Sequence, residues 1–394
     1  MKYIKKFDNV GDYQEFKDST KYKRPNVSFI LESEETKVDP IYYYREYFTI
    51  EALEDGLTAK LSINDCEYRV DDGGEWNSLS KATNTVTINT GQILSFRGNL
   101  TPSADNGIGT FTISKKCNVK GNIMSLLYGD NFEGQTDLTG KKYAFHKLFN
   151  KCTNIVDASE LILPATTLSE DCYYYMFWNC TSLTTAPELP ATILAYECYN
   201  SMFYDCSSLT IAPQLPATEL VHRCYQNMFY KCTSLTTSPE LPTTILANYC
   251  YESMFSNCTS LTIAPELPAT TLTLGCYCGM FSGCTNLTTA PELPATTLTH
   301  SCYDCMFERC TSLTTSPELP ATTLALHCYY YMFYGCTSLN NITMLATNIN
   351  ASNCLYNWVS GVAATGTFTK AASMTTLPNG VNGIPSGWTV INNS

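Results

Sequence analysis

The sequence contains little charge. Lys, Arg, Asp and Glu make up 15% of its 394 residues, compared with about 25% in an average soluble domain. Acidic residues outnumber basic ones by 36 to 24, and the net charge is −12. Without a basic surplus to neutralise phosphates, we expect no nucleic-acid partner. No apolar run approaches the roughly 18 residues of a membrane-spanning helix, so we also expect no membrane insertion.

Signals for export and for catalysis are missing as well. The first residues, MKYIKKFDNVGDYQEF, include lysines but no apolar core segment, so we expect no secretory signal peptide. There is no glycine-rich phosphate loop followed by lysine, no His-Glu-x-x-His and no serine elbow. The four histidines are scattered along the chain: His146, His222, His300 and His327. We therefore predict a protein that is not an enzyme and that uses no cofactor.

Cysteine is abundant instead, with 20 residues, and most of them follow a fixed spacing. Eight recur every 26 residues from Cys172 to Cys354, and seven more recur at the same interval from Cys180 to Cys336. Cys152 belongs to an earlier, degenerate copy. A constant period of this length is typical of a solenoid, in which each unit buries its apolar side only against its neighbours.

One unit, CYNSMFYDCSSLTIAPQLPATELVHR, divides into two halves. Its first apolar positions, Cys198, Met202, Phe203 and Cys206, are spaced like one face of a short helix. The next residues alternate like a strand with one buried face, which would direct the column of Ile211 inward. Proline follows and cannot donate ladder hydrogen bonds, so regular pairing should shrink to bridges of two or three residues. Each 26-residue repeat is thus predicted to hold a short helix and a short strand.

The repeats also resemble a known family. Segments such as MFWNCTSLTTAPELPATIL, with Met-Phe, Cys, Leu and an extended end that carries Pro, are similar to the BspA-type leucine-rich repeats of gut and oral bacteria and their phages. The likeness covers residues 145–360, and GTFTKAASMTTLPNGVNGIPSGWTV resembles the closing segment of such proteins. The resemblance implies a leucine-rich-repeat-like α/β solenoid and a role in adhesion or recognition.

The regions outside the repeats differ in character. Residues 46–140 contain short alternating segments, such as TAKLSI and TVTINT, that predict a small all-β, sandwich-like domain. Residues 1–45 are rich in Lys and Tyr and are predicted to be an attachment arm, and KYIKKFDNVGDY is similar to the starts of structural proteins in phages of gut bacteria. The solenoid should span residues 141–360, and residues 361–394 should cap its open end.

The cysteines leave two interpretations open. Those of the two regular series lie on the predicted buried face, where free cysteine behaves as a small hydrophobe, and parallel side chains rarely reach disulfide geometry. We therefore predict a reduced core ladder. Cys278 and Cys305 break the series. They form either a zinc site or one disulfide between repeats, or they point elsewhere while their neighbours fill the core.

A glutamate column accompanies the predicted strands. Its members are Glu188, Glu240, Glu266, Glu292 and Glu318, interrupted by Gln214. Facing outward about 5 Å apart, these carboxylates either bind calcium or form a solvated ladder. We favour the ladder, because a flat row of oxygen atoms does not enclose an ion. A regular array also lacks the two different environments that the acid and the nucleophile of a glycosidase require.

Other columns vary from repeat to repeat, and they favour Tyr, Trp, Arg and Asn. These positions lie off the buried stripe, and their composition is typical of binding surfaces, although neutral drift on an unselected surface is the alternative. A constant Tyr column that runs from Tyr173 to Tyr329 is predicted to be structural and half-buried. The predicted ligand-binding residues are Tyr174, Tyr175, Trp178, Tyr196, Tyr204, His222, Arg223, Tyr230, Tyr249, Arg309, Tyr330, Tyr331 and Tyr334.

The leading functional hypothesis is a recognition protein of a phage virion. A tail- or head-fibre-type component would bind a glycan or a protein on the host cell through the solenoid. Its N-terminal region would join it to other virion or surface-assembly proteins, and a homo-oligomer is compatible with this role. The expected location is the virion surface, after synthesis in the host cytoplasm. Two alternatives are a purely structural or decorating virion protein and a BspA-like adhesin on the bacterial cell surface.

Overall fold

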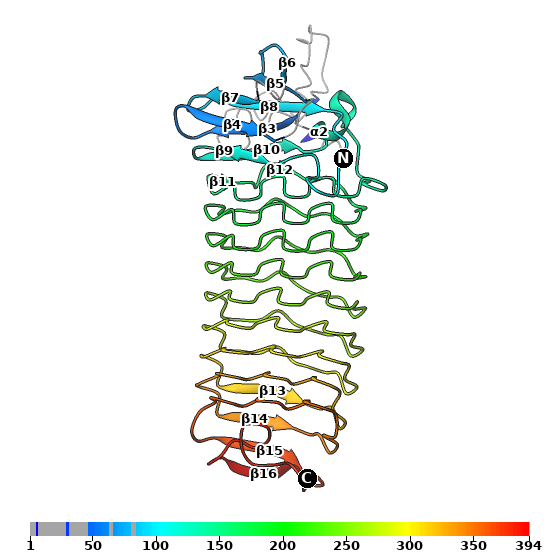
Figure 1. The fold of residues 1–394 in the computed structure, drawn as a ribbon, viewed down its shortest axis with the longest axis vertical. Helices are drawn as coiled ribbons and strands as arrows, with labels where there is room; N and C mark the ends of the chain where they lie inside the picture. The colour runs from blue at the N-terminus through cyan, green and yellow to red at the C-terminus, as the bar shows by residue number, and fades with distance from the viewer. Residues whose placement is uncertain (1–4, 7–28, 31–45, 63–65, 80–83, 394) are drawn as a thin grey trace.

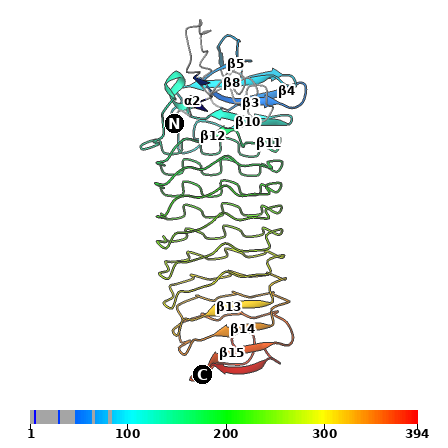
Figure 2. The same ribbon diagram turned by 180° about the vertical axis from the view of Figure 1, so that it is seen from behind.

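A computed structural model describes residues 5–6, 29–30, 46–62, 66–79 and 84–393. Most of the predicted attachment arm therefore lies outside the described residues. The elongated molecule places a β-rich part at one end and a column of stacked coils below it (Figure 1, Figure 2). Among the described residues, no helix combines the length and apolar character needed to cross a membrane.

Two sheets of the β-rich part share one apolar core, and β1 and β2 pair separately. One sheet has the order β11-β10-β3-β8-β5-β6, with β12 also paired to β10, and the other has the order β7-β4-β9. Phe48 and Phe96 of the first sheet contact Phe111 of the second, with ring centroids 5.4 and 5.0 Å apart. The elements of this part are β1 (Lys5–Lys6), β2 (Phe29–Ile30), β3 (Phe48–Ala52), β4 (Leu57–Leu61), β5 (Cys66–Val70), β6 (Asn77–Leu79), β7 (Thr85–Ile88), β8 (Ile93–Gly98), β9 (Phe111–Ile113), β10 (Cys117–Asn122), α2 (Ser125–Tyr128) and the 3-10 turn Gly129–Asn131.

Strand β10 joins this part to the coils. It pairs antiparallel with β3 and parallel with β11 (Ile155–Asp157) and β12 (Leu161–Ile162), which belong to the first coil. The first sheet therefore continues without a break into the extended face of the solenoid, which we call the strand face. Phe149 of the first coil also contacts Phe48, at 5.6 Å between ring centroids, so the two parts share core contacts as well.

The coils form the predicted leucine-rich-repeat-like solenoid. In the middle coils the strand face is held by isolated parallel bridges, such as Thr185 to Ile211 and Ile211 to Thr237. Proline follows the bridge residues Thr185, Ile211 and Thr237 by two positions and supplies no N–H donor, in keeping with the short pairing there. Longer strands appear only towards the C-terminal end: β13 (Thr315–Leu319), β14 (Asn341–Met344), β15 (Thr367–Ala371) and β16 (Thr389–Asn393).

In the other half of each repeat, the predicted short helix is wrong, and the chain forms successive turns instead. Residues 171–180 follow consecutive four-residue turns, and every fourth residue has a positive φ, as at Asp171 (54°), Tyr175 (57°) and Asn179 (58°). Apolar residues at positions 0, 4, 5 and 8 fit such turns as well as a helix, because both conformations can direct two neighbouring residues inward every four positions. The backbone thus differs from the prediction, while the residues expected to be buried are buried.

Hydrogen bonds along these turn segments alternate between two directions. The N–H of Tyr174 donates to the carbonyl of Asp171 within the same turn, at 3.2 Å. The N–H of Tyr175 donates to the carbonyl of Asn200 in the next coil, also at 3.2 Å. The alternation recurs from coil to coil, so buried backbone groups are paired either locally or between coils. An α-helix would have kept all of these bonds within one coil.

The interior consists of ladders of identical side chains. Phe203 and Phe229 stack with centroids 5.7 Å apart, and the Tyr column stacks in the same way, as in Tyr199 to Tyr225 at 5.8 Å. Tyr199 is only 1% exposed. The Tyr column is therefore structural, as predicted, but it is fully buried rather than half-buried.

The cysteine series complete these ladders, which confirms that they are core residues. Both series are buried, and none of their members forms a disulfide within the described residues. The thiol of Cys206 donates to the carbonyl of Phe177 in the preceding coil, at 3.1 Å, and the same bond recurs at Cys180 and at Cys336. The second cysteine of each repeat thus links neighbouring coils through a weak hydrogen bond.

The column of Ile211 was predicted to face inward, and this is wrong. The Ile211 side chain is 64% exposed. Thr210 and Ile211 both point outward, and the next buried residue is Ala212. Strict alternation fails because the chain bends between the turn segment and the strand face, so that two successive residues occupy an outer corner.

Candidate functional site

The turn segments direct two pairs of side chains per coil outward, and we call this surface the turn edge. In the coil of Cys172 the pairs are 174–175 and 178–179, which alternate with the buried Cys-Tyr and Met-Phe pairs. Just before each first cysteine lies a third outward pair, such as 196–197. All of the predicted ligand-binding residues lie at these three places, and each is at least partly exposed.

The predicted residues nearest the β-rich part form a first aromatic cluster. Tyr174 and Tyr175 lie 4.1 Å apart between ring centroids, and Trp178 lies 6.0 Å from Tyr175. Trp178 is also 6.0 Å from Tyr204, which stacks on Tyr230 at 4.6 Å with an interplanar angle of 12°. Coil stacking thus turns residues separated by 26 positions into one continuous row.

A parallel row runs along the third pair of each coil. Ring centroids are 5.4 Å apart for Tyr196 and His222, and 5.8 Å apart for His222 and Tyr249. The Arg223 guanidinium lies 5.5 Å from the Tyr249 ring centroid and donates to Glu197 at 3.1 Å. This row therefore carries one cation that is held by a ring and a carboxylate.

The last predicted residues form a second aromatic cluster. Tyr331 lies 4.7 Å from Tyr330 and 5.1 Å from Tyr334. Tyr356, which stacks on Tyr330 at 5.1 Å, belongs to the same cluster and was missed by sequence reasoning. The signal was present, since Tyr356 follows Cys354 as Tyr330 follows Cys328, two residues after the cysteine.

The middle of the turn edge, in the coils that begin at Cys250, Cys276 and Cys302, has no aromatic side chain in its two outward pairs and separates the two clusters. Its inner column holds Gln226, Glu252, Cys278 and Asp304 at equivalent positions of successive coils. Gln226 donates to Glu252 at 2.6 Å, and burial raises the pKa of both Glu252 and Asp304. Of the predicted residues only Arg309 lies here. The predicted set therefore forms two clusters and one side row rather than a single patch.

The degenerate first coil contributes polar groups that the sequence did not single out. Lys151 Nζ lies 5.1 Å from the Trp178 ring centroid. His146 is 5% exposed, contacts the Tyr174 ring at 5.2 Å, and neither ring nitrogen has a hydrogen-bond partner among the described residues. Burial, with a smaller contribution from Lys147, lowers the pKa of His146 to about 4. A neutral imidazole therefore supports the first aromatic cluster at neutral pH.

The two irregular cysteines lie on the same edge but not in a metal site. Within the described residues, no group of three or more His, Cys, Asp or Glu side chains is placed to hold a metal ion. The carboxylates of the glutamate column are exposed along the strand face, and they too form no such group among the described residues. Burial, followed by the nearby Asp304 carboxylate, raises the pKa of both the Cys278 and Cys305 thiols.

A thiol-labelling experiment tests this arrangement. At pH 8, the folded protein should react with Ellman's reagent at no more than two thiols, Cys278 and Cys305, because the others are buried. A raised pKa leaves little thiolate at this pH, so the two reactions should be slow and should accelerate steadily with increasing pH, without levelling off near pH 9. All 20 thiols should react after denaturation without reductant. A deficit of two or more would instead indicate disulfides, and a Cys278→Ser/Cys305→Ser variant should lose the slow reaction.

A comparison with protein families identifies the repeats. Residues 142–265 and 248–370 match the family described as BspA type leucine rich repeat region, in six copies. A crystal structure of a leucine-rich repeat protein from Bacteroides ovatus ATCC 8483 is similar at 14% sequence identity and a TM-score of 0.32, over 74% of this chain and 97% of that chain. A comparison with curated proteins finds no match.

Proposed function

Since this chain belongs to the family of BspA-type leucine-rich repeat proteins, we propose that it is a non-enzymatic recognition protein that binds its target through the turn edge. Membership in this repeat family suggests a role in protein binding or adhesion. The observation that carries the proposal is the collection of partly exposed Tyr and Trp side chains at variable positions. Rigid aromatic side chains supply large contact areas at low entropic cost, and they dominate binding energies at protein surfaces.

The geometry of the clusters favours a protein target over a glycan. Tyr204 and Tyr230 face each other at 4.6 Å, and Lys151 lies over the ring of Trp178. In these contacts a neighbouring coil covers one face of each ring, which leaves less ring face open to a ligand. Carbohydrate recognition by stacking needs an open ring face, whereas tyrosine hydroxyls and ring edges suit the mixed polar and apolar surface of a protein.

We further propose that the chain is a tail- or head-fibre-type component of a phage virion. The resemblance of the N-terminal segment to the starts of phage structural proteins supports this role, with the N-terminal region contacting other virion proteins. The virion surface is then its location, and a host-cell surface protein or glycan is the target. A BspA-like adhesin on the bacterial surface and a structural or decorating virion protein are the alternatives to be tested.

Four substitutions test the binding surface. Trp178→Ser, Tyr204→Ser, Tyr230→Ser and Tyr334→Ser together should reduce attachment of the purified protein to host cells more than tenfold, because each removes an aromatic anchor of the kind that contributes about 2 kcal/mol or more at an interface. Attachment is measured by flow cytometry with the labelled protein, alongside thermal unfolding. A matched control replaces four exposed isoleucines of the strand face with Ser, namely Ile193, Ile211, Ile245 and Ile263.

The outcomes separate the candidate functions. Loss of attachment in the aromatic variant, with the isoleucine variant unchanged, supports recognition by the turn edge. Equal attachment of both variants would reject it. Electron microscopy of purified particles tests the virion role, and a deletion of residues 141–394 that impairs particle assembly rather than adsorption would favour the structural alternative.

A further inference from the structure

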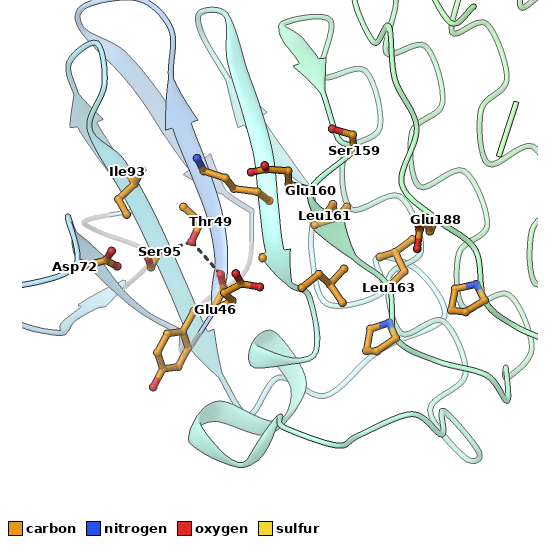
Figure 3. Close-up of a pocket in the computed structure, with 16 residues that line it drawn as sticks. Glu46, Thr49, Asp72, Ile93, Ser95, Ser159, Glu160, Leu161, Leu163 and Glu188 are labelled. Atoms are coloured by element: carbon orange, nitrogen blue, oxygen red, sulfur yellow. Dashed lines mark hydrogen bonds between the residues drawn. The ribbon is translucent and has the colours of Figure 1, made fainter. Parts of the chain in front are cut away.

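A cavity of about 430 Å³ lies on the strand face where the β-rich part meets the first coils (Figure 3). Its volume falls within the range of small-molecule sites, roughly 300–1,000 Å³. Strands β3, β8 and β10 supply one wall, and the coil residues around β12 and Pro190 supply the other. The cavity uses the extended half of the repeats rather than the turn edge, so it is separate from the proposed recognition surface.

The coil side of the cavity offers an apolar floor. Ile162 is 37% exposed, and Pro164 and Pro190 extend the same surface, while Leu161 and Leu163, each 3% exposed, belong to the core beneath it. Ile93 lines the other end of the cavity, on the sheet side near Asp72 (Figure 3). The lining contains only one aromatic residue, Tyr47, whose ring is committed to Trp76 at 4.9 Å and to Phe132 at 5.2 Å. An aliphatic chain fits this floor better than a stacked sugar ring.

The charges at the cavity are predominantly negative. Four carboxylates line it, against one ammonium group, that of Lys120: Glu46, Asp72, Glu160 and Glu188. Lys120 already pairs with Glu51 outside the lining, at 3.1 Å, and Asp72 pairs with Arg69, also at 3.1 Å. Glu160 and Glu188 have no ion pair and no side-chain hydrogen bond within the part of the chain that the structure describes. The unbalanced charge therefore comes from these two glutamates.

The hydrogen bonds within the cavity wall also favour a ligand that donates hydrogen bonds. The Thr49 hydroxyl, on a side chain only 7% exposed, donates to the carbonyl of Tyr47 at 2.9 Å. Ser95, 1% exposed and 3.1 Å from Thr49 between hydroxyl oxygens, must therefore donate to Thr49. The Ser159 hydroxyl donates to Asp157 at 3.1 Å. These hydroxyl protons are used within the protein, so the cavity offers mainly acceptors and requires a ligand that donates.

From this geometry we infer that the cavity is a binding site for a protonated primary amine carried on an aliphatic stem. The ammonium group supplies donors and positive charge to Glu160 and Glu188, and the stem covers Ile162 and Pro164. Both a free alkyl diamine and the lysine side chain of a peptide have this chemistry. The inference does not rest on the proposed function, since no turn-edge residue takes part.

The test titrates the full chain, labelled with ¹³C at the isoleucine methyl groups, with 1,5-diaminopentane and separately with Nα-acetyl-lysine amide. The signals of Ile93 and Ile162, which line the cavity, should shift, whereas those of the exposed Ile211 and Ile263 should not. Saturation by the diamine alone identifies a free amine as the ligand, and saturation by the lysine amide identifies a chain-borne one. Glutarate, a dianion of similar length, should leave all four signals unchanged.

A matched pair of variants distinguishes binding by the cavity glutamates from attraction of the amine to the negative charge of the whole face. Glu160→Gln/Glu188→Gln should weaken amine binding about tenfold or more, while Glu266→Gln/Glu292→Gln, which lie on the same face outside the cavity, should change it less than twofold. Unshifted Ile93 and Ile162 signals at millimolar amine would overturn the inference. Equal loss in both variants, or equal shifts with glutarate, would overturn it too. Thermal unfolding of each variant confirms that the comparison is between folded proteins.

Discussion

Replacing Phe229 with alanine should lower the free energy of unfolding by about 3–5 kcal/mol. The Phe229 side chain is fully buried, and its ring stacks between Phe203 at 5.7 Å and Phe255 at 5.6 Å. Truncation removes both contacts and leaves a void that neighbouring coils cannot fill, because their backbones are tied together by the hydrogen bonds of the turn segments. Urea unfolding, followed by circular dichroism, measures the loss.

The matched control for this variant is Ile211→Ala, which removes a similar apolar side chain from the outer corner of a neighbouring coil. Because Ile211 is mostly exposed, its loss should change the free energy of unfolding by no more than about 0.5 kcal/mol. A loss of 2 kcal/mol or more at Ile211 would place this column inside the solenoid and would refute the strand face described above. Together, the two variants test which side of each coil is the interior.

Replacing Asn227 with proline should cost more than about 3 kcal/mol. Asn227 has a φ of 56°, whereas the proline ring fixes φ near −65°. Its N–H also donates to the carbonyl of Glu252 in the next coil, at 2.9 Å, and proline would leave that carbonyl without its partner. The change therefore breaks both the local turn and one link between coils. Chemical unfolding and the yield of soluble protein report the effect.

Glycine at the same position distinguishes the turn conformation from a helix. In a helix, Asn227→Gly would destabilise the protein, since glycine is a poorer helix former than asparagine. At a positive φ, glycine avoids the steric cost of a Cβ atom, so the free energy of unfolding should stay unchanged or rise by up to about 1 kcal/mol. A clear loss of stability in the glycine variant would mean that the segment is helical after all.

Parts of the candidate site could be predicted from the repeats alone. Comparing copies within the chain identified outward columns such as those of Trp178 and Tyr204, because packing holds the inward columns constant. The copies did not show that Tyr174 to Tyr230 and Tyr330 to Tyr356 form separate clusters. That depends on which coils carry small or acidic residues in between, and on the distances at which coils stack. The cavity beside Glu160 and Glu188 was not foreseen either, because it needs strands from two distant regions.

The amino-acid sequence by itself determined the 26-residue period, the residues that fill the core and the solenoid architecture, because burial of Cys, Tyr, Met, Phe and Leu in every copy leaves only stacking against identical neighbours as a solution. Only the tertiary structure decided between a helix and successive turns, since both bury the same residues at a four-residue spacing. The turns are favoured because alternate N–H groups donate to carbonyls of the next coil. The sequence of a single repeat cannot show these bonds between coils. The outward position of Ile211 has the same origin, because the bend of the chain at each corner is set by where neighbouring coils pair.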